Sequence, residues 1–546
     1  MPGKEALFTA STPRSWFKGL GAQPKEFSMT SLMLAGGLSA ILYSLLFLGH
    51  APSGSAWIVL VPLISRLGFE KPKTAFWTGW LSGWVAYTGI GHWLLPMLLR
   101  AHLASVGTCF GVFLIFVYLG FLWGLWFLGV SQITRWAKQH PILLGAAPLV
   151  MAMGWVALEY LRTYLFSGLP WALLADTQID HPLLLQLASV TGVYGISFLI
   201  VWANGTLALG IWFICAFFKH ESLGSFKPLA VEFIFLFLTL GGTLWFGQHR
   251  LQHPTQNPAQ SVSIAIVQPN SDPTEKWSEE RSRRLEAILA EMDSQAALPK
   301  PDIILWPEGA VPEYPFTGHE VDAWLRRVIE TSRTPHLIGG PRWDGKRGYN
   351  TAFSITGDFR LVGTYDKVHL CPFAEVTPFV HFLGRWFHKL NELRDCKAGS
   401  TIKPLFLGGI LYSPMICYES IFPSLIRRSV QQGGQVIVSL SNDGWFGETP
   451  ALSQHFAASV WRAVENDRWL ICVDNSGISA IINSSGIVVA RTPMFQRAIL
   501  RGIVYPRTSQ TFYGHYGDVF AKICSALSVL IIFWAIFLGL YGFKNP

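Results

Sequence analysis

The sequence predicts a protein of two parts, a membrane domain of about eight transmembrane helices and a separate α/β domain. Two observations indicate this fold class. Of the 546 residues, 51% are hydrophobic and only 14% are charged, and the mean hydropathy of +0.34 is too high for an ordinary soluble protein. The apolar residues are also unevenly distributed: they dominate residues 30–247 and 519–543, whereas residues 261–507 have the mixed composition of a globular domain. Part of the chain must therefore lie in lipid.

The membrane domain is predicted from apolar runs between polar breaks. A helix needs roughly 20 residues to cross a hydrocarbon core. Seven runs of about this length form a membrane domain at 30–247, and an eighth run forms a C-terminal transmembrane helix within 519–543. The segment 1–29 is basic and has no cleavable signal pattern, so we expect it to stay in the cytoplasm. The eight runs lie near 30–49, 54–68, 75–98, 104–133, 142–165, 194–218, 228–247 and 519–541.

Basic residues in the short loops predict the orientation, because Lys and Arg favour the cytoplasmic side. They follow the second, fourth and sixth runs, whereas the opposite loops contain only Arg100 and the acidic Asp176 and Asp180. This asymmetry places the globular domain on the far side of the membrane. The net charge of +8 reflects this topology and anionic lipid headgroups. No basic, aromatic groove indicates binding of nucleic acid. The basic loop residues are Arg66, Lys71, Lys73, Arg135, Lys138, Lys219 and Lys227.

The globular stretch alternates strands with helices, which predicts a layered α/β domain with its site at the strand ends. Four β-branched runs, VSIAIVQPN, PDIILWPEG, GILYSPMICYES and QVIVSLSNDGWFG, each end in polar residues. Helix-like stretches such as 279–296 and 322–331 lie between them. Glu308 and Cys417 both occupy predicted strand ends.

Three segments of this domain carry the groups needed for acyl transfer through a thioester: Glu308 in WPEGA, Lys367 in YDKVHLCPF and Cys417 in MICYES. A free thiol has a pKa near 8.5, so a lysine and a base beside it are expected to supply the thiolate near neutral pH. An ammonium directed at the developing oxyanion is a large catalytic term, often worth ~3 kcal/mol. Alone, such a glutamate is usually a solvated loop residue and such a cysteine an inert buried thiol. Their combination favours catalysis.

These segments, in this order, resemble the nitrilase superfamily of carbon-nitrogen hydrolases, whose triad is Glu, Lys and Cys. The membrane block followed by VQPN, PFAEVTPF, SNDGWFG and QHF is similar to the apolipoprotein N-acyltransferase family within it, as is SGLPW at 167–171. The resemblance implies an αββα sandwich for the domain. It makes Cys417 the nucleophile, Glu308 the general base and Lys367 the group that stabilises the oxyanion. It also implies supporting roles for Glu375, Glu419 and Tyr418 and substrate-binding roles for Trp277, Asn350, Trp445 and Phe446.

The reaction that the resemblance implies has two steps and needs no cofactor. Cys417 takes an acyl chain from a membrane phospholipid, and the α-amino group of a lipoprotein's diacylglyceryl-cysteine then receives it as an amide. We therefore expect a monomeric, multi-pass protein of the bacterial inner membrane with its catalytic domain in the periplasm. The apolar run Phe379 to Phe387 is predicted to be a lid that dips into lipid.

Other polar residues receive structural interpretations. His369 and His455 have no partner at metal-ligand spacing, so no metal site is predicted. Asn442 and Asp443 are expected to organise a turn. The chain departs from the family pattern at Ala374, at Cys371 and at ALLADTQ after SGLPW. The pattern leaves a Cys371–Cys396 disulfide open, and the other cysteines, Cys109, Cys215, Cys472 and Cys524, lie in apolar runs.

Two other functions compete with acyl transfer to a lipoprotein. A membrane-tethered amidase or nitrilase would share the triad and transfer its acyl group to water. A transporter or binding protein would use the α/β domain only to capture a ligand. The transporter is disfavoured because charged residues within the runs are few, with Glu159 and Arg162 near an end, and no pair of broken helices marks a path.

Overall fold

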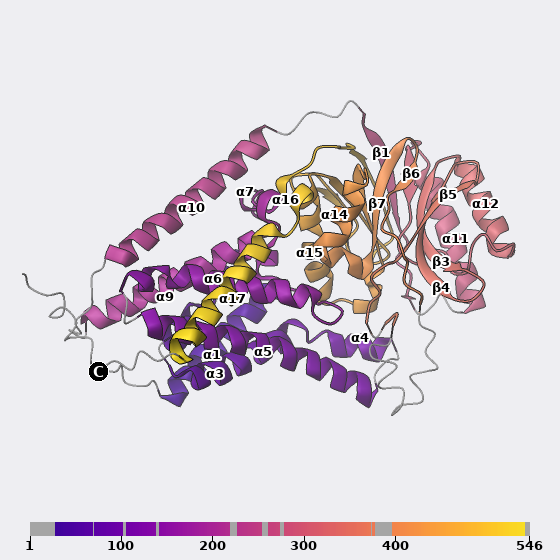
Figure 1. Ribbon diagram of the computed structural model, residues 1–546. Helices are drawn as coiled ribbons and strands as arrows, with labels where there is room; N and C mark the ends of the chain where they lie inside the picture. Colours follow the sequence, from indigo (N-terminus) through magenta and orange to yellow (C-terminus); the bar gives the residue numbers. More distant parts are fainter. Residues whose placement is uncertain are drawn as a thin grey trace, which may run out of the picture.

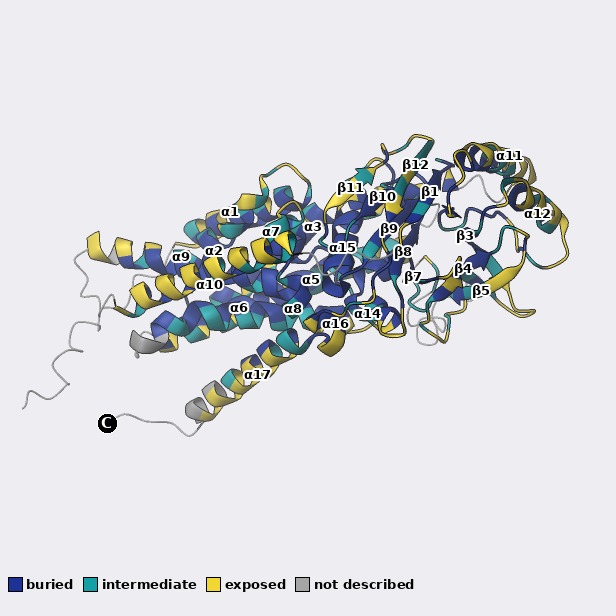
Figure 2. Ribbon diagram, turned by 90° about the horizontal axis from the view of Figure 1, so that it is seen from above, coloured by how far each residue is buried: buried dark blue, intermediate teal, exposed yellow. Residues whose placement is uncertain are grey.

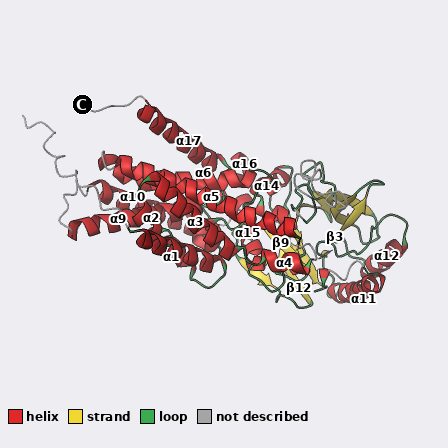
Figure 3. Cartoon of the chain, turned by 90° about the horizontal axis from the view of Figure 1, so that it is seen from below, coloured by secondary structure: helices red, strands yellow, loops and turns green. Residues whose placement is uncertain are grey.

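The computed structural model describes residues 28–68, 70–101, 105–137, 141–218, 227–253, 260–273, 278–372, 374–376 and 396–540. It consists of a helical bundle at one end and an α/β domain at the other (Figure 1). The described strands all lie in the α/β domain, which also contains helices, whereas the described part of the bundle is helical (Figure 3). Among the bundle helices, α10 (Lys227–Gln252) and α17 (Val519–Leu540) are exposed along much of their length (Figure 2). An apolar side chain that faces outward on such a helix is placed to face lipid.

The bundle packs its helices closely through small residues. A side chain at Gly120 of α5 (Val106–Ala137) would meet the backbone of Trp84 and Trp80 on α3 (Pro72–Ile90) at 2.7 and 2.8 Å, so only glycine allows this approach. The other bundle helices are α1 (Met29–Phe47), η2 (Ser53–Trp57), α2 (Val61–Leu67), α4 (Leu94–Arg100), α6 (Pro141–Tyr164), η3 (Leu174–Gln178), α7 (Pro182–Leu185), α8 (Ala188–Thr191) and α9 (Tyr194–Phe218).

Within the described ranges, five helices are long and apolar enough to cross a membrane: Met29–Phe47, Val106–Ala137, Leu144–Tyr164, Tyr194–Cys215 and Lys227–Gln252. The predicted run 54–68 instead folds as the short helices η2 and α2. The run 75–98 is interrupted after Ile90, so that α4 forms a separate short helix. The continuous apolar composition of residues 75–98 predicted a single helix. Composition alone does not show where one helix ends and the next begins.

The α/β domain contains two six-stranded sheets, in the orders β12-β1-β2-β3-β4-β5 and β11-β10-β9-β8-β7-β6. The centre of each sheet is parallel, with β1, β2 and β3 in one and β7, β8 and β9 in the other, and antiparallel strands flank both. The strands are β1 (Val262–Gln268), β2 (Ile303–Leu305), β3 (His336–Trp343), β4 (Gly348–Ile355), β5 (Leu361–Asp366), β6 (Leu405–Leu407), β7 (Ile410–Ile416), β8 (Val436–Ser441), β9 (Trp469–Asp474), β10 (Ala480–Ile482), β11 (Val488–Arg491) and β12 (Ala498–Val504).

Three apolar cores define four layers. One core joins the facing sides of the two sheets. The second lies between the first sheet and helices α11 (Glu279–Ala296) and α12 (Glu320–Ser332). The third lies between the second sheet and helices α14 (Pro423–Gln431) and α15 (Ala451–Asn466). The domain is therefore the αββα sandwich that the family resemblance implied.

Helix α15 joins the sandwich to the bundle. Its Trp461 donates to Asp176 Oδ1 of η3 at 2.8 Å, and Trp93 and Trp171 of the bundle both donate to Gln454 Oε1, at 3.2 and 2.8 Å. The Gln454 amide in turn donates to the backbone carbonyls of Phe47 and Ile90, near the ends of α1 and α3. The bundle end that carries Asp176 therefore faces the α/β domain.

Candidate active site

Each member of the predicted triad follows a β-strand. Glu308 lies just beyond β2, Lys367 directly follows β5, and Cys417 directly follows β7 and begins the short helix η6 (Cys417–Ile421). The backbone at Glu308 lies close against Gly339 of β3, where any side chain would meet Pro307 O at 2.5 Å and Glu308 Cα at 2.7 Å. Glu308 and Lys367 therefore follow strands of one sheet and Cys417 follows a strand of the other. The three residues lie together between the ends of these strands.

Lys367 lies at the centre of a cluster of polar side chains at this site. Its side chain is 1% exposed, and its Nζ lies 2.8 Å from Glu375 Oε2 and 3.5 Å from Glu308 Oε1. Asn350 donates from Nδ2 to Glu308 Oε1 at 2.6 Å and to Glu375 Oε1 at 2.8 Å. Asn350 was predicted as a substrate-binding candidate, but in the structure it bridges the two carboxylates. The Cys371 backbone N–H donates to Glu375 Oε2 at 2.8 Å and completes the cluster.

The charges of this cluster set the protonation of its members. Burial disfavours the Lys367 ammonium, but Glu375 and Glu308 outweigh it and hold the lysine pKa well above its usual value. Burial disfavours the Glu375 carboxylate too, yet Lys367 and the Asn350 donor leave its pKa lowered. At Cys417 burial wins: together with the nearby Glu308 it raises the thiol pKa well above the ordinary value, and Lys367 opposes this only in part. The raised pKa favours the protonated thiol at Cys417 near neutral pH, where the sequence led us to expect a thiolate.

Glu419 fixes the two loops that carry Lys367 and Cys417 relative to each other. Its side chain is fully buried. Its Oε2 accepts from the Ile416 N–H at 2.8 Å, on the Cys417 side. On the Lys367 side its Oε1 accepts from the Val368 N–H at 2.7 Å, the His369 N–H at 3.0 Å and the Tyr365 hydroxyl at 2.9 Å. Glu419 therefore connects the backbone beside Cys417 to the backbone beside Lys367.

The membrane domain contacts the loop that carries Cys417. Tyr418, the residue after Cys417, donates its hydroxyl to the backbone carbonyl of Gly168 at 2.9 Å. Gly168 belongs to SGLPW, the segment after α6, and Trp171 of the same segment packs against the ring of Phe446 at 6.0 Å. The next residues, ALLADTQ at 172–178, are largely buried, and the last five of them form η3. The family-like segment of the bundle thus lies beside Cys417.

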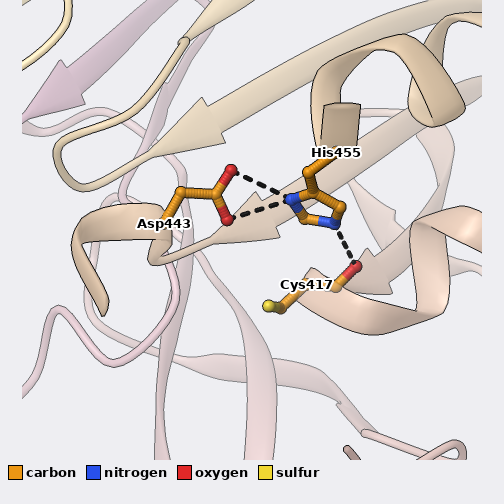
Figure 4. A group of neighbouring side chains, drawn as sticks. All are labelled: Cys417, Asp443 and His455. Carbon is orange, nitrogen blue, oxygen red and sulfur yellow. Dashed lines mark hydrogen bonds and ion pairs between the residues drawn. The ribbon is translucent and has the colours of Figure 1, made fainter. Parts of the chain in front are cut away.

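A second group near Cys417 was not predicted. His455 of α15 lies between the Asp443 carboxylate and the backbone carbonyl of Cys417 (Figure 4). Among the described residues, Cys417, Asp443 and His455 form the one group whose potential metal-binding atoms lie within 4.8 Å of one another. Hydrogen bonds engage both ring nitrogens of His455, so the histidine has no nitrogen left for a metal. Asp443 was predicted to organise a turn, whereas its carboxylate contacts His455.

The remaining predicted residues fall in different places. Trp445 and Phe446 lie in η7 (Asp443–Phe446), where both are partly exposed and Phe446 also packs on Trp93 at 5.0 Å. Trp277 and the predicted lid at 379–387 lie outside the described residues. Cys371 is a free thiol, so it does not form the disulfide with Cys396 that the sequence left open. Ala374 is exposed next to Glu375 and donates its N–H to the Cys371 carbonyl at 3.3 Å.

Comparison with known proteins assigns both parts of the chain. The family model described as "Apolipoprotein N-acyltransferase N-terminal domain" matches residues 39–206, and the model described as "Carbon-nitrogen hydrolase" matches residues 263–510. An apolipoprotein N-acyltransferase of Geobacter metallireducens is 33% identical over 90% of this chain and 93% of its own length. Those of Caulobacter vibrioides and Agrobacterium fabrum are 29% and 30% identical, over 91% and 79% of this chain and 92% and 85% of their own lengths.

These matches extend over the helical bundle and the sandwich together, in the same order along the chain. The geometry around Cys417 and the relatives therefore lead to one assignment: the chain belongs to the apolipoprotein N-acyltransferase family.

Proposed function

We propose that this protein transfers a fatty acyl chain from a membrane phospholipid, through a thioester on Cys417, to the N-terminal α-amino group of a diacylglyceryl-modified lipoprotein. The observation that carries the proposal is the Lys367 ammonium held by Glu375 and Glu308 in the same buried cluster as the Cys417 thiol. The names of the relatives support the acceptor. Contact between this cluster and the membrane segment at Gly168 supports lipid substrates.

In the first step the Cys417 sulfur attacks the ester carbonyl of the phospholipid, and the thiol proton passes to Glu308. A protonated resting thiol makes this base necessary, because a group with a raised pKa supplies little thiolate at neutral pH. Lys367 stabilises the negative charge that develops on the carbonyl oxygen. When the intermediate collapses, the carbon–oxygen bond breaks and Glu308 returns the proton to the departing lysophospholipid alcohol.

In the second step the lipoprotein amine attacks the thioester. Glu308 removes a proton from the nitrogen, the carbon–sulfur bond breaks, and the sulfur leaves and regains its proton, which restores the resting thiol. Glu375 and Asn350 keep Lys367 and Glu308 in place throughout, since Glu375 contacts Lys367 and Asn350 connects Glu375 to Glu308. We further propose that the protein acts as a monomer in the bacterial inner membrane, with the α/β domain on the periplasmic side that the charge pattern predicts.

A membrane-tethered amidase with the same three residues would give different products. The test incubates the purified protein with phosphatidylethanolamine vesicles and a synthetic diacylglyceryl-cysteine peptide, and measures lysophospholipid, N-acyl peptide and free fatty acid. We expect lysophospholipid and N-acyl peptide in equal amounts, and neither with Cys417→Ala or Lys367→Met. The exposed Cys215 of α9 provides a matched control, because Cys215→Ala should leave both yields unchanged. Free fatty acid without N-acyl peptide would instead establish a hydrolase.

A further inference from the structure

His455 occupies a buried position in which both of its ring nitrogens face acceptors. Its Nδ1 lies 2.9 Å from each oxygen of Asp443. Its Nε2 lies 3.1 Å from the backbone carbonyl oxygen of Cys417 and 2.8 Å from the Ser420 hydroxyl. A carboxylate and a carbonyl can only accept hydrogen bonds, and a neutral imidazole has only one N–H. The Ser420 hydroxyl can also donate to Nε2, but hydrogen bonds to both the Asp443 carboxylate and the Cys417 carbonyl exist together only when the ring is an imidazolium.

The surroundings favour this charged form. Burial disfavours the imidazolium, but Asp443 outweighs burial, and Asp474 of β9 adds to it, so that the pKa of His455 is raised. The indole of Trp171 lies flat against the ring, with centroids 5.6 Å apart and an angle of 9° between the planes. A cation is stabilised over the face of an indole. Trp171 belongs to the membrane domain, so the bundle itself helps to hold this histidine.

The Cys417 backbone has an unusual conformation where His455 contacts it. Its φ is +49°, in the left-handed region that residues with a side chain rarely adopt. The chain changes there from strand β7 to helix η6. A peptide group is planar, so a bond to the Cys417 carbonyl also fixes the direction of the Tyr418 N–H. Figure 4 shows that the hydrogen bond from His455 reaches the carbonyl oxygen of Cys417 and not its sulfur, so the ring contacts the backbone of this residue, with the sulfur within 4.8 Å.

We propose that His455, held by Asp443 and Trp171, is a positioning residue that keeps the Cys417 backbone in its left-handed conformation and so directs the thiol toward the acyl donor. The role given to Cys417 rests on the proposed function. The connection through Trp171 means that the nucleophile loop is held correctly only while the α/β domain is docked on the bundle.

The test compares two amides that each replace one ring nitrogen. The amide nitrogen of glutamine reaches the position of Nε2 and retains a donor for the Cys417 carbonyl, whereas that of asparagine reaches the position of Nδ1 and retains only the contact with Asp443. Loss of one buried hydrogen bond corresponds to a decrease of roughly 10- to 100-fold in kcat. We therefore expect His455→Asn to lower kcat by that factor with KM nearly unchanged, and His455→Gln to recover most of it.

The same variants are examined without turnover, by the rate at which iodoacetamide alkylates Cys417. We expect this rate to change in His455→Asn and to return toward the wild-type value in His455→Gln. The exposed His515 of α16 (Phe512–Tyr516) is the matched control, because its Asn and Gln variants should behave like the wild type. Equal kcat and equal alkylation rates in the two His455 variants would overturn the proposal, whether both were active or both impaired.

Two further measurements distinguish a failure of the His455 proposal from misfolding of the variant and from a failure of the proposed function. If His455→Asn does not fold, Asp443→Leu replaces it: the ring then loses the carboxylate that orients it and, as a neutral imidazole, can accept from the Ser420 hydroxyl at Nε2 in place of donating to the Cys417 carbonyl. Asp443→Leu should then lower kcat, and full activity would contradict the positioning of Cys417 by His455 and Asp443. If the wild-type protein transfers no acyl chain, the proposed function fails, but the alkylation rates still decide whether His455 positions Cys417.

Discussion

The two helix layers of the sandwich cover equivalent sheets but have opposite surroundings. On α11 and α12, Arg283 pairs with Glu279 and Arg326 with Glu330, and all four side chains are between 47% and 79% exposed. On α15 every residue except Ser453 is buried, including charged ones. One layer faces solvent, whereas the other lies between its sheet and the membrane bundle. A helix with buried charged residues can therefore dock one domain on another, and in this protein the docked layer is the one that contacts Cys417.

The largest effect is expected from breaking the buried ion pair of the docked layer. Arg462 contacts Glu465 through Nε at 2.8 Å and Nη2 at 2.9 Å, and neither side chain is more than 2% exposed. Arg462→Met leaves Glu465 buried without its charge partner, which should cost about 3–5 kcal/mol of stability. Thermal unfolding in detergent measures this. The double variant Arg462→Met/Glu465→Leu should recover most of the loss, and equal losses in the single and double variants would contradict the pairing.

Burial on the docked side extends to the Cys417 thiol and predicts a pH dependence. Because burial raises the pKa of this thiol, it is protonated at pH 7, and its thiolate fraction increases with pH up to that raised pKa. The alkylation rate should therefore increase roughly tenfold per pH unit from pH 7 to 9, about 100-fold in total, where an ordinary thiol of pKa near 8.5 would level off. Site-resolved mass spectrometry after iodoacetamide treatment measures the rate. A plateau below pH 8 would show that the neighbouring lysine dominates instead.

Gln454 tests the polar contacts between the layer and the bundle. Gln454→Leu removes the acceptor of the Trp93 and Trp171 indoles and the donor to two helix-end carbonyls. Leaving such buried groups unpaired should cost about 2 kcal/mol. Gln454→Glu retains the acceptor oxygen but turns a second oxygen toward the Phe47 and Ile90 carbonyls, so it should be no more stable than Gln454→Leu. A melting temperature of Gln454→Leu equal to that of the wild type would mean that these contacts do not hold the domains together.

The smallest effect is expected on the solvent-facing layer. Arg283→Ala and Arg326→Ala each remove one exposed i,i+4 pair. Such pairs contribute at most about 0.5 kcal/mol. Thermal unfolding should show both variants within that range of the wild type. A loss as large as that of Arg462→Met would remove the distinction between the two layers.

Much of the architecture could be predicted from the sequence. Buried parallel strands are continuous β-branched runs, so β1, β2, β7 and β8 and the polar residues at their ends could be recognised, whereas the other strands were not predicted. The long apolar runs likewise indicated the bundle. The division of residues 75–98 into α3 and α4 was not visible, because the composition stays apolar across the break after Ile90.

The site could be predicted less completely. Glu308, Lys367 and Cys417 each have a reactive group within a distinctive segment, which is why sequence alone could select them. Asn350 was predicted to bind substrate from the resemblance alone, and its contacts with Glu308 and Glu375 could not be predicted because these two residues are distant from it in the chain. His455 was set aside because Asp443 is 12 residues away and its other partner is a backbone carbonyl, which no sequence pattern records.

The most direct test of the account is the intact mass of the purified protein after incubation with phospholipid alone, for the wild type and Cys417→Ala. We expect the wild type to gain the mass of one fatty acyl chain, to lose it on treatment with hydroxylamine, and the variant to gain none. An acyl adduct of equal size on Cys417→Ala, or none on wild-type protein with lipid bound, would contradict a thioester at Cys417.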